Sequence, residues 1–277
     1  MIYDVAIVTV AYNKLFPECL TSIRDAMRAS SLSSCFVLVD NASTSFAAHA
    51  FVRAHIPDAL VVLRDKNYGM GASSNRGARE VDAKYYFFLN PDTTCPDSLI
   101  LQRLFAFMEK HPKVGIVAPR IHHMDGAFQE THRRFPAWYM PLAQRTWVAK
   151  TLRGARYADT FLMRDIRITT PRMIDWAQGS ALFVAADVFH TLEGFDERFW
   201  MYFEDVDLCR RSWEIYRPVY YHPDIVLHHA FGKGSVVSGN VVKSFAKNRQ
   251  LRAHIFSWVK YLWKWGARRR AIATRYA

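Results

Sequence analysis

The chain has 277 residues, of which 51% are hydrophobic and 14% aromatic, so it can bury a core as one or two domains and is not a disordered protein. Its formal net charge of +12 predicts an anionic partner: a phosphate-bearing ligand, a nucleic acid or an anionic membrane surface. The cysteines lack a C-x-x-C motif and zinc-finger spacing, which predicts buried thiols in a reducing compartment; they are Cys19, Cys35, Cys95 and Cys209.

No basic segment precedes the first apolar run, and no uncharged apolar run is long enough to cross a bilayer, so we expect neither a signal peptide nor a membrane span. Short apolar runs then alternate with amphipathic segments. Pro17 opens a predicted helix with Leu20 and Ile23 on one face. Pro96 opens another, which stops before Pro112. The predicted buried strands cover residues 5–10, 35–39, 61–63, 85–89 and 114–118, and this alternation predicts an α/β fold with a doubly wound sheet.

Polar residues or a glycine follow the first four of these strands: Asn13, Asp40, Gly69 and Asp92. Each residue alone is ordinary turn chemistry. As a set they lie at the carboxyl edge of the expected sheet, where ligands bind in open α/β folds. The sequence therefore predicts a ligand site at this edge.

Regular alternation stops between residues 120 and 175, a basic and aromatic segment that predicts an irregular subdomain over the sheet edge. Residues 181–184 predict another buried strand, and residues 187–192 a short helix. The stretch FWMYFEDVDLCRR follows, with Glu204, Asp205 and Asp207 at the start of a helical pattern behind an aromatic run. Carboxylates there can cap a helix, but an acid held against apolar surface is also a stronger base.

Seven segments together resemble glycosyltransferase family 2, the large inverting family with the GT-A fold, and most of all its bacterial rhamnosyltransferase-like members. They are VTVAYN, VDNAST, NYGMGASSNRG, FFLNPDT, WAQGSALFV, GFDERFWMYFEDVDLCRR and LHHAFGKGS, in the family's order over roughly residues 3–235. The resemblance implies a GT-A, Rossmann-like, mostly parallel sheet flanked by helices, followed by a basic helical C-terminal segment.

The resemblance also implies a site for a nucleotide sugar. Asp40 would accept the N3–H of the base, and the other donor-binding residues would be Val10, Tyr12, Asn13, Asn67, Gly69, Asn75, Asn90, Asp92 and Gly179. Asn90 and Asp92 match the family's D-x-D motif with Asn in the first place. Asp92 would bind Mg²⁺ or Mn²⁺, and His228 would complete the metal site, with His229 as a rival at a spacing that fits equally well.

By the same resemblance Asp205 is the catalytic base that deprotonates the acceptor hydroxyl, and Glu204 orients it or contacts the acceptor. Asp207 is expected to cap the helix or to pair with Arg210 or Arg211. The reaction implied is transfer of a sugar from a dTDP- or UDP-sugar, with L-rhamnose favoured, to a polyprenyl-diphosphate-linked or oligosaccharide acceptor in bacterial surface-polysaccharide synthesis.

The expected domains are a catalytic domain at residues 1–240, with an acceptor-side segment at 120–175, and a basic amphipathic segment at 241–277. In that last segment a basic helix carries one apolar face, made of Ile255, Trp258, Val259, Leu262 and Trp265. It predicts either a contact with the inner face of the bacterial inner membrane, making the protein cytoplasmic and peripheral, or a helix docked on its own catalytic domain.

Two other functions fit parts of the sequence. A nucleotidyltransferase that makes nucleotide sugars needs a glycine-rich loop after the first strand, and VTVAYNKLFPE contains no glycine. A non-catalytic nucleic-acid- or membrane-binding protein would suit the +12 charge, but carboxylates gather at the expected ligand edge, which argues against binding a polyanion such as nucleic acid there.

Overall fold

The computed structural model describes residues 2–45, 48–140, 151–230 and 248–266. The strands are β1 Tyr3–Ala11, β2 Ser34–Asp40, β3 Leu60–Leu63, β4 Ala83–Leu89, β5 Thr93–Thr94, β6 Ile116–His123, β7 Phe128–Gln129, β8 His132–Arg133, β9 Arg172–Met173, β10 Trp176–Ala177, β11 Ala181–Ala185 and β12 Val219–His229. The helices are α1 Pro17–Ala29, α2 Ala48–His55, α3 Met70–Ala78, α4 Ile100–Lys110, α6 Leu152–Phe161, α7 Ala186–Thr191, α8 Glu204–Glu214 and α10 Arg249–Trp265.

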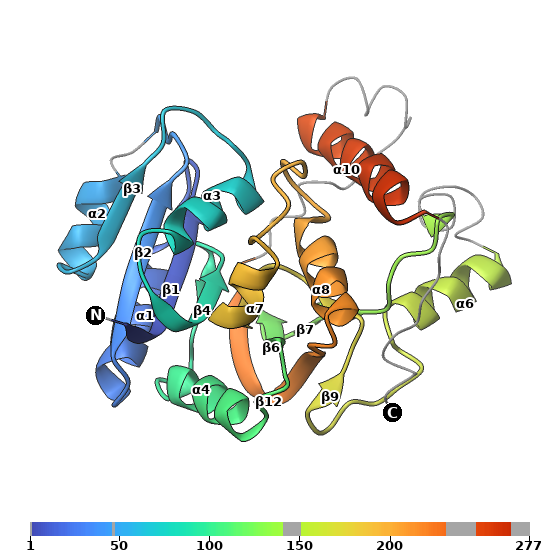
Figure 1. Cartoon of the computed structure of the whole chain (residues 1–277), viewed down its shortest axis with the longest axis horizontal. Coiled ribbons are helices and arrows are strands. Elements are labelled where there is room, and N and C mark those ends of the chain that lie inside the picture. The colour runs from blue at the N-terminus through green and yellow to red at the C-terminus, as the bar shows by residue number, and fades with distance from the viewer. Residues whose placement is uncertain (1, 46–47, 141–150, 231–247, 267–277) are drawn as a thin grey trace.

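One large sheet runs through the molecule in the order β3-β2-β1-β4-β11-β6-β12-β5 (Figure 1). Strands β1 to β4 pair in parallel, as do β6 and β12, while β11 lies antiparallel between β4 and β6. The mostly parallel α/β sheet expected from the sequence is therefore confirmed. Because β1, β2, β3 and β4 run the same way, their carboxyl ends meet at one edge and bring four distant loops together.

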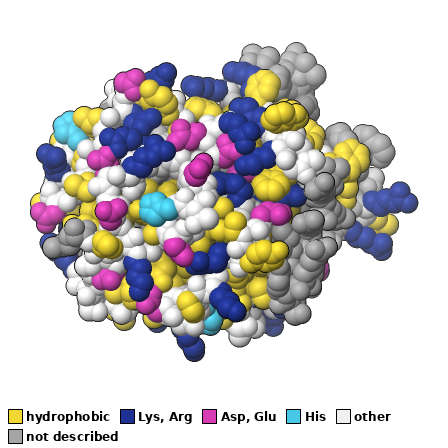
Figure 2. Space-filling view, viewed as in Figure 1, with side chains coloured by type: hydrophobic (Ala, Val, Ile, Leu, Met, Phe, Trp, Pro, Cys, Tyr) yellow, Lys and Arg dark blue, Asp and Glu magenta, His cyan; other side chains and the backbone are white. Residues whose placement is uncertain are grey.

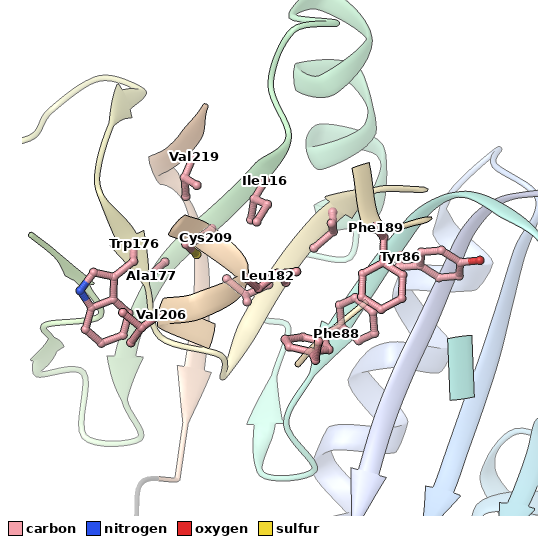
Figure 3. Close-up of a cluster of buried hydrophobic side chains, with 14 of the residues drawn as sticks. Tyr86, Phe88, Ile116, Trp176, Ala177, Leu182, Phe189, Val206, Cys209 and Val219 are labelled. Atoms are coloured by element: carbon pink, nitrogen blue, oxygen red, sulfur yellow. The ribbon is translucent and has the colours of Figure 1, made fainter. Parts of the chain in front are cut away.

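Helices cover both faces of the sheet. The cluster on one face includes Leu20 of α1, Val52 of α2 and Leu104 of α4. The opposite cluster joins the sheet to α3, α7 and α8, and Figure 3 shows Tyr86 and Phe88 of β4 beside Phe189, with Val206 and Cys209 of α8 farther along. All four cysteines are buried free thiols, as expected from their spacing.

Several predicted boundaries shift in the structure. The helix expected from Pro96 begins at Ile100, because Asp97 first accepts a hydrogen bond from the Leu99 N–H in a preceding turn. Helices α2 and α6 were not predicted. The sequence also predicts strands at residues 218–221 and 225–227, and in the structure they form one strand, β12, with an irregularity between His222 and Val226.

Helix α10 packs above α8 (Figure 1). Tyr261 is buried and accepts a hydrogen bond from Arg210 at 2.9 Å. The Lys264 ammonium and the Trp265 indole N–H both donate to the fully buried Asp207, at 2.9 and 2.8 Å. The docked helix, one of the two expected arrangements, is therefore present. The boundary proposed at residue 240 lies outside the described residues.

The predicted apolar face of α10 is only partly right. Trp258 and Trp265 pack against the core, but so do Ser257 and Lys264, which are not part of the predicted apolar face. A second stripe faces outward, with Phe256, Val259 and Trp263 at 57%, 51% and 83% exposure. Within the described residues, no helix combines the length and apolarity that crossing a membrane requires.

Asp207 holds this docking together. It also accepts a hydrogen bond from Arg211 at 2.7 Å, the pairing expected on α8. Replacing it by alanine leaves Arg211 without its buried counter-charge and leaves Lys264 paired with Asp196 alone, so we expect Asp207→Ala to lower the free energy of unfolding by about 3 kcal/mol. Urea denaturation checks this, with the exposed Asp58→Ala as the control. A loss no larger than that of the control would contradict the assignment.

Candidate active site

The loops after β1 and β2 are tied to each other at the ligand edge. Asp40 ends β2, is 7% exposed, and accepts a hydrogen bond from the Ser43 N–H at 2.9 Å. Asn13, with a φ of 55°, accepts from the Thr44 and Ser45 N–H groups at 2.7 and 3.1 Å. The Asn13 side chain therefore holds the loop that follows Asp40. Tyr12, the residue before Asn13, is 45% exposed.

Asn41 is the residue here that the sequence analysis missed. It is buried and donates to the Asn67 side chain at 3.0 Å and to the Gly69 carbonyl at 3.3 Å. The oxygen of the Asn41 side-chain amide accepts hydrogen bonds from the Tyr68 N–H and the Ser73 hydroxyl, at 3.1 and 2.8 Å. One amide therefore fixes the loop that starts α3 against the end of β2.

Gly69 and Asn75 join α3 to the segment ahead of α8. Gly69 has a φ of 90°, and a Cβ there would lie 1.9 Å from the Trp200 carbonyl oxygen, so only glycine fits. Asn75 is buried and forms reciprocal hydrogen bonds with the Phe195 backbone, both at 2.8 Å. These two bonds give the Asn75 side chain a positioning role. The predicted contact of Asn75 with the nucleotide sugar stays a prediction.

Asp92 meets His229 rather than His228. The Asp92 carboxylate lies 2.9 Å from His229 Nε2, and His229 Nδ1 lies 3.2 Å from the Gln129 amide oxygen. His228 is placed instead next to His122, with ring centroids 6.3 Å apart. The structure therefore brings the rival histidine, His229, and not His228 next to Asp92, and a metal ion held there stays a prediction.

A carboxylate oxygen and an imidazole nitrogen 2.9 Å apart suit adjacent ligands of one divalent cation, whose ligands at about 2.1 Å lie about 3 Å from each other at right angles. The Lys14 ammonium, 3.8 Å from Asp92, shows that this carboxylate attracts cations. Over the described part of the chain, no three His, Cys, Asp or Glu side chains gather in a metal-binding group. A cation here would need further ligands, which a diphosphate and water supply.

The turn before α8 is strained. Tyr202 and Phe203 have φ values of 67° and 68°, although neither is glycine. Such left-handed residues persist only where the surrounding structure holds them, and they cluster at functional sites. Here they set Glu204 and Asp205 at the first turn of α8, facing the ends of β1 and β4.

The two carboxyl groups lie in a narrow cleft of about 20 Å³, room for about one water molecule. Among predicted site residues the cleft is lined by Val10, Asn90, Gly179, Glu204 and Asp205. Asp205 accepts from the Gly179 N–H at 2.8 Å, an approach that a side chain at position 179 would crowd. Burial raises the pKa of Asp205, and this N–H and the Arg133 guanidinium oppose the rise.

Glu204 is buried, and its Oε2 has no hydrogen-bond partner among the described residues. Burial, and then the charge of Asp205, raise the pKa of Glu204 well above its usual value. Both carboxyl groups therefore hold a proton more tightly than an exposed acid does, so one group of the pair can act as a base while the other donates a hydrogen bond.

A raised carboxyl pKa makes a pH-dependent contribution to stability. The folded chain keeps the Glu204 proton above pH 4.5, the ordinary value, where the unfolded chain releases it, so this stabilisation is lost as pH rises. We expect the melting temperature of Glu204→Gln to rise relative to that of the wild type as pH increases from 4.5 to 8. Each unit of pKa shift changes the free energy of unfolding by about 1.4 kcal/mol. Thermal unfolding across this range checks it, and a difference that does not change with pH would contradict the shift.

The structure thus arranges the predicted residues in three neighbouring groups. The first holds Asp40, Asn13 and the Asn67–Gly69 loop, the second Asp92 with His229, and the third the cleft with Asp205. Polar groups that could frame a nucleoside, a metal-bound diphosphate and a proton acceptor follow each other along one sheet edge.

Comparison with known proteins gives the family. A family model described as Glycosyl transferase family 2 matches residues 5–169, more than half of the chain. An N-acetylglucosaminyl-diphospho-decaprenol L-rhamnosyltransferase from Mycobacterium tuberculosis is 28% identical over 216 residues, covering 70% of this chain and 66% of the relative. Rhamnosyltransferase WbbL from Escherichia coli K12 is 25% identical over 222 residues, covering 75% and 74%.

Solved structures agree on the fold. TarS from S. aureus in complex with UDP superposes with a TM-score of 0.54 at 13% identity, covering 83% of this chain and 61% of that one. The mannosyltransferase PcManGT from Pyrobaculum calidifontis, in complex with GDP-Man and Mn²⁺, gives 0.53 at 16% identity, covering 84% and 58%. The sheet and helices described above are the GT-A fold, and by its sequence the chain belongs to glycosyltransferase family 2.

Proposed function

We propose that this protein transfers a sugar, L-rhamnose from dTDP-L-rhamnose, to a polyprenyl-diphosphate-linked or oligosaccharide acceptor with inversion, in the synthesis of a bacterial surface polysaccharide. The observation that carries the proposal is the placement of Asp205 at the strained start of α8, in a narrow cleft at the carboxyl edge of the sheet. The rhamnosyltransferases among the relatives support the sugar, and the mycobacterial enzyme's lipid-diphosphate acceptor supports the acceptor class.

In the proposed reaction Asp205 accepts the proton of an acceptor hydroxyl. That oxygen bonds to the anomeric carbon of the sugar as the bond from this carbon to the diphosphate oxygen breaks. The electron pair leaves with the nucleoside diphosphate, and attack from the opposite face inverts the configuration. The raised pKa of Asp205 makes it a stronger base than an exposed aspartate, and the protonated Glu204 donates a hydrogen bond that orients the acceptor.

Asp92 and His229 would hold Mg²⁺ or Mn²⁺ against the diphosphate. Such a cation neutralises the charge that develops on the departing diphosphate. Asn90 follows β4 beside them and would contact the donor as a neutral group. Asp40, at the end of β2, would accept the N3–H of uracil or thymine, which is why a dTDP- or UDP-sugar is proposed.

The donor is tested by a panel of nucleotides and nucleotide sugars measured as shifts in melting temperature, with and without Mn²⁺. We expect dTDP- and UDP-compounds to stabilise the protein more than ADP-compounds, because only uracil and thymine present the N3–H to Asp40. A ligand at one hundred times its dissociation constant stabilises by about 2.7 kcal/mol. Equal shifts for all nucleotides would remove Asp40 from base recognition.

The proposed membrane contact moves to the outer stripe of α10. Phe256, Val259 and Trp263 are exposed, with Arg252 and Lys260 on the same helix. Figure 2 shows hydrophobic and basic side chains intermixed over the face on which α10 lies. An apolar stripe flanked by cations suits an anionic lipid surface, to which the inner surface of the bacterial membrane would correspond.

We expect serine at Phe256, Val259 and Trp263 together to reduce sedimentation with phosphatidylglycerol vesicles by at least about tenfold, because each of the larger side chains contributes about 1.5–3 kcal/mol when fully buried. Donor binding should be unaffected, since the stripe faces away from the domain. The control replaces Leu63 and Leu99, which are 63% and 47% exposed elsewhere. Equal vesicle binding by both variants and the wild type would contradict the contact.

A further inference from the structure

A second cavity, of about 280 Å³, opens beside the β6–β7 hairpin and has no part in the donor site described above. Cationic and imidazole groups converge on it: Arg120, Arg164, Arg167, His122 and His132. Glu130 is the one carboxylate of its lining and is paired with Arg164 at 2.9 Å. Within the described residues, neither Arg120 nor Arg167 has a carboxylate in ion-pair range.

Hydrogen bonds and ring stacking hold side chains of the cavity lining in place. Arg120 is held by the Tyr221 hydroxyl at 3.3 Å and the Ile168 carbonyl at 3.4 Å. The His132 ring stacks on Tyr221 with centroids 4.3 Å apart. His132 is 6% exposed, and its Nδ1 has no hydrogen-bond partner among the described residues. Leu162 and Phe128 add an apolar rim.

The cavity is lined mostly by residues of the 120–175 segment, which is expected from the sequence to lie on the acceptor side, and it lies near the catalytic cleft. Tyr221 belongs to the same core cluster as Val206 and Cys209 of α8. His132 pairs with Ala177 in the β8–β10 ladder, two residues before the glycine that contacts Asp205. One strand spacing and two residues of extended chain amount to about 10 Å, the scale of one sugar and its first phosphate.

We propose that this cavity binds the diphosphate of the lipid-linked acceptor, with the first carbons of the lipid against its apolar rim. The inference rests on the proposed function and names the subsite for the acceptor. Guanidinium groups bind phosphate oxygens in pairs through their parallel N–H groups, and two of the three here have no competing carboxylate. The donor diphosphate has its own place at Asp92 and His229, so the two diphosphates occupy separate sites.

The test uses Arg167→Gln, because Arg167 is exposed and has no ion pair with another described residue, with Arg167→Lys as a partial rescue. The control is Arg172→Gln, the same charge change at an exposed residue outside the cavity. Each protein is assayed with an acceptor sugar on a short isoprenyl diphosphate and with the same sugar on a neutral alkyl chain. Donor hydrolysis without acceptor is measured alongside. Binding of inorganic diphosphate is titrated with the donor site saturated by dTDP.

We expect Arg167→Gln to lower kcat/KM for the diphosphate acceptor and the affinity for inorganic diphosphate by roughly tenfold or more, the range for a lost charge-assisted hydrogen bond. Transfer to the neutral acceptor and donor hydrolysis should stay unchanged. Equal losses with both acceptors, no loss, or the same loss in Arg172→Gln would overturn the subsite. Weakened diphosphate binding with unchanged acceptor preference would overturn the acceptor as its source and leave a free-anion site.

Failure of the proposed function has a different signature. In that case the wild type shows neither donor hydrolysis nor transfer to either acceptor. The inorganic diphosphate titration is independent of activity, and absence of Arg167-dependent binding in it would overturn the subsite.

Discussion

Asp205→Asn should lose turnover by roughly two to four powers of ten, the range for removal of a general base. The amide oxygen can still accept the Gly179 N–H, so the head of α8 keeps its geometry, but it cannot take a proton from an acceptor hydroxyl. Donor affinity should barely change, because the proposed base and metal contacts are made by Asp40 and Asp92, whereas Asp205 acts on the acceptor hydroxyl. Steady-state transfer rates and donor titrations measure the two effects.

Asp224→Asn, an exposed change on β12, is the matched control and should keep normal turnover. The pair itself provides the sharper comparison. If Glu204→Gln is inactive while Asp205→Asn turns over normally, the roles of the two acids are exchanged. The pH profile adds a readout: turnover should rise with pH through a midpoint above the ordinary aspartate value, because burial raises the pKa of Asp205.

Asp92→Ala should abolish the metal dependence of donor binding. Asp92 offers the carboxylate nearest to His229, and without it one imidazole nitrogen cannot hold a hard cation against a diphosphate. The fold should persist, since the side chain lies at a strand-end loop and not in the core. Donor titrations with and without Mn²⁺ measure the effect.

The control for this change is Asp97→Ala, which removes a carboxylate five residues later that pairs with Arg103 at 3.0 Å. It should keep both donor affinity and its response to Mn²⁺. If the donor affinity of Asp92→Ala still rises when Mn²⁺ is added, as in the wild type, the cation binds at a site that does not include Asp92.

The sheet and the acid pair could be predicted from the sequence because both depend on local sequence pattern. Buried β-branched runs such as residues 5–10 have few alternatives to a parallel strand, and Glu204 and Asp205 stand visibly at a helix start. Asn41 was missed because its importance comes from four partners on a loop more than twenty residues away, which no local pattern reveals.

The choice between His228 and His229 depended on β12 being irregular. Tyr221 belongs to the core on the α8 side of the sheet, whereas Ile225 and Leu227 belong to the core on the α4 side. The register shift between His222 and Val226 exchanges the two faces, and a one-residue change of that kind reverses which histidine turns toward Asp92.

Helix α10 shows a similar limit. Its sequence carries two apolar stripes, and the docked one is selected by Asp207, a distant buried carboxylate that binds Lys264 and Trp265. From the helix sequence alone, Lys264 is expected to face solvent. Only the tertiary ion pair turns that side of the helix inward and leaves Phe256 and Trp263 exposed.

The most direct test of the account is transfer itself. Purified protein is incubated with dTDP-L-rhamnose, Mn²⁺ and a lipid-diphosphate-linked sugar, and the product is examined by mass spectrometry and by NMR of the new anomeric centre. The account predicts one added deoxyhexose whose anomeric configuration is opposite to that of the donor, formed by the wild type and lost in Asp205→Asn. A product of retained configuration, or transfer at the same rate by Asp205→Asn, would contradict it.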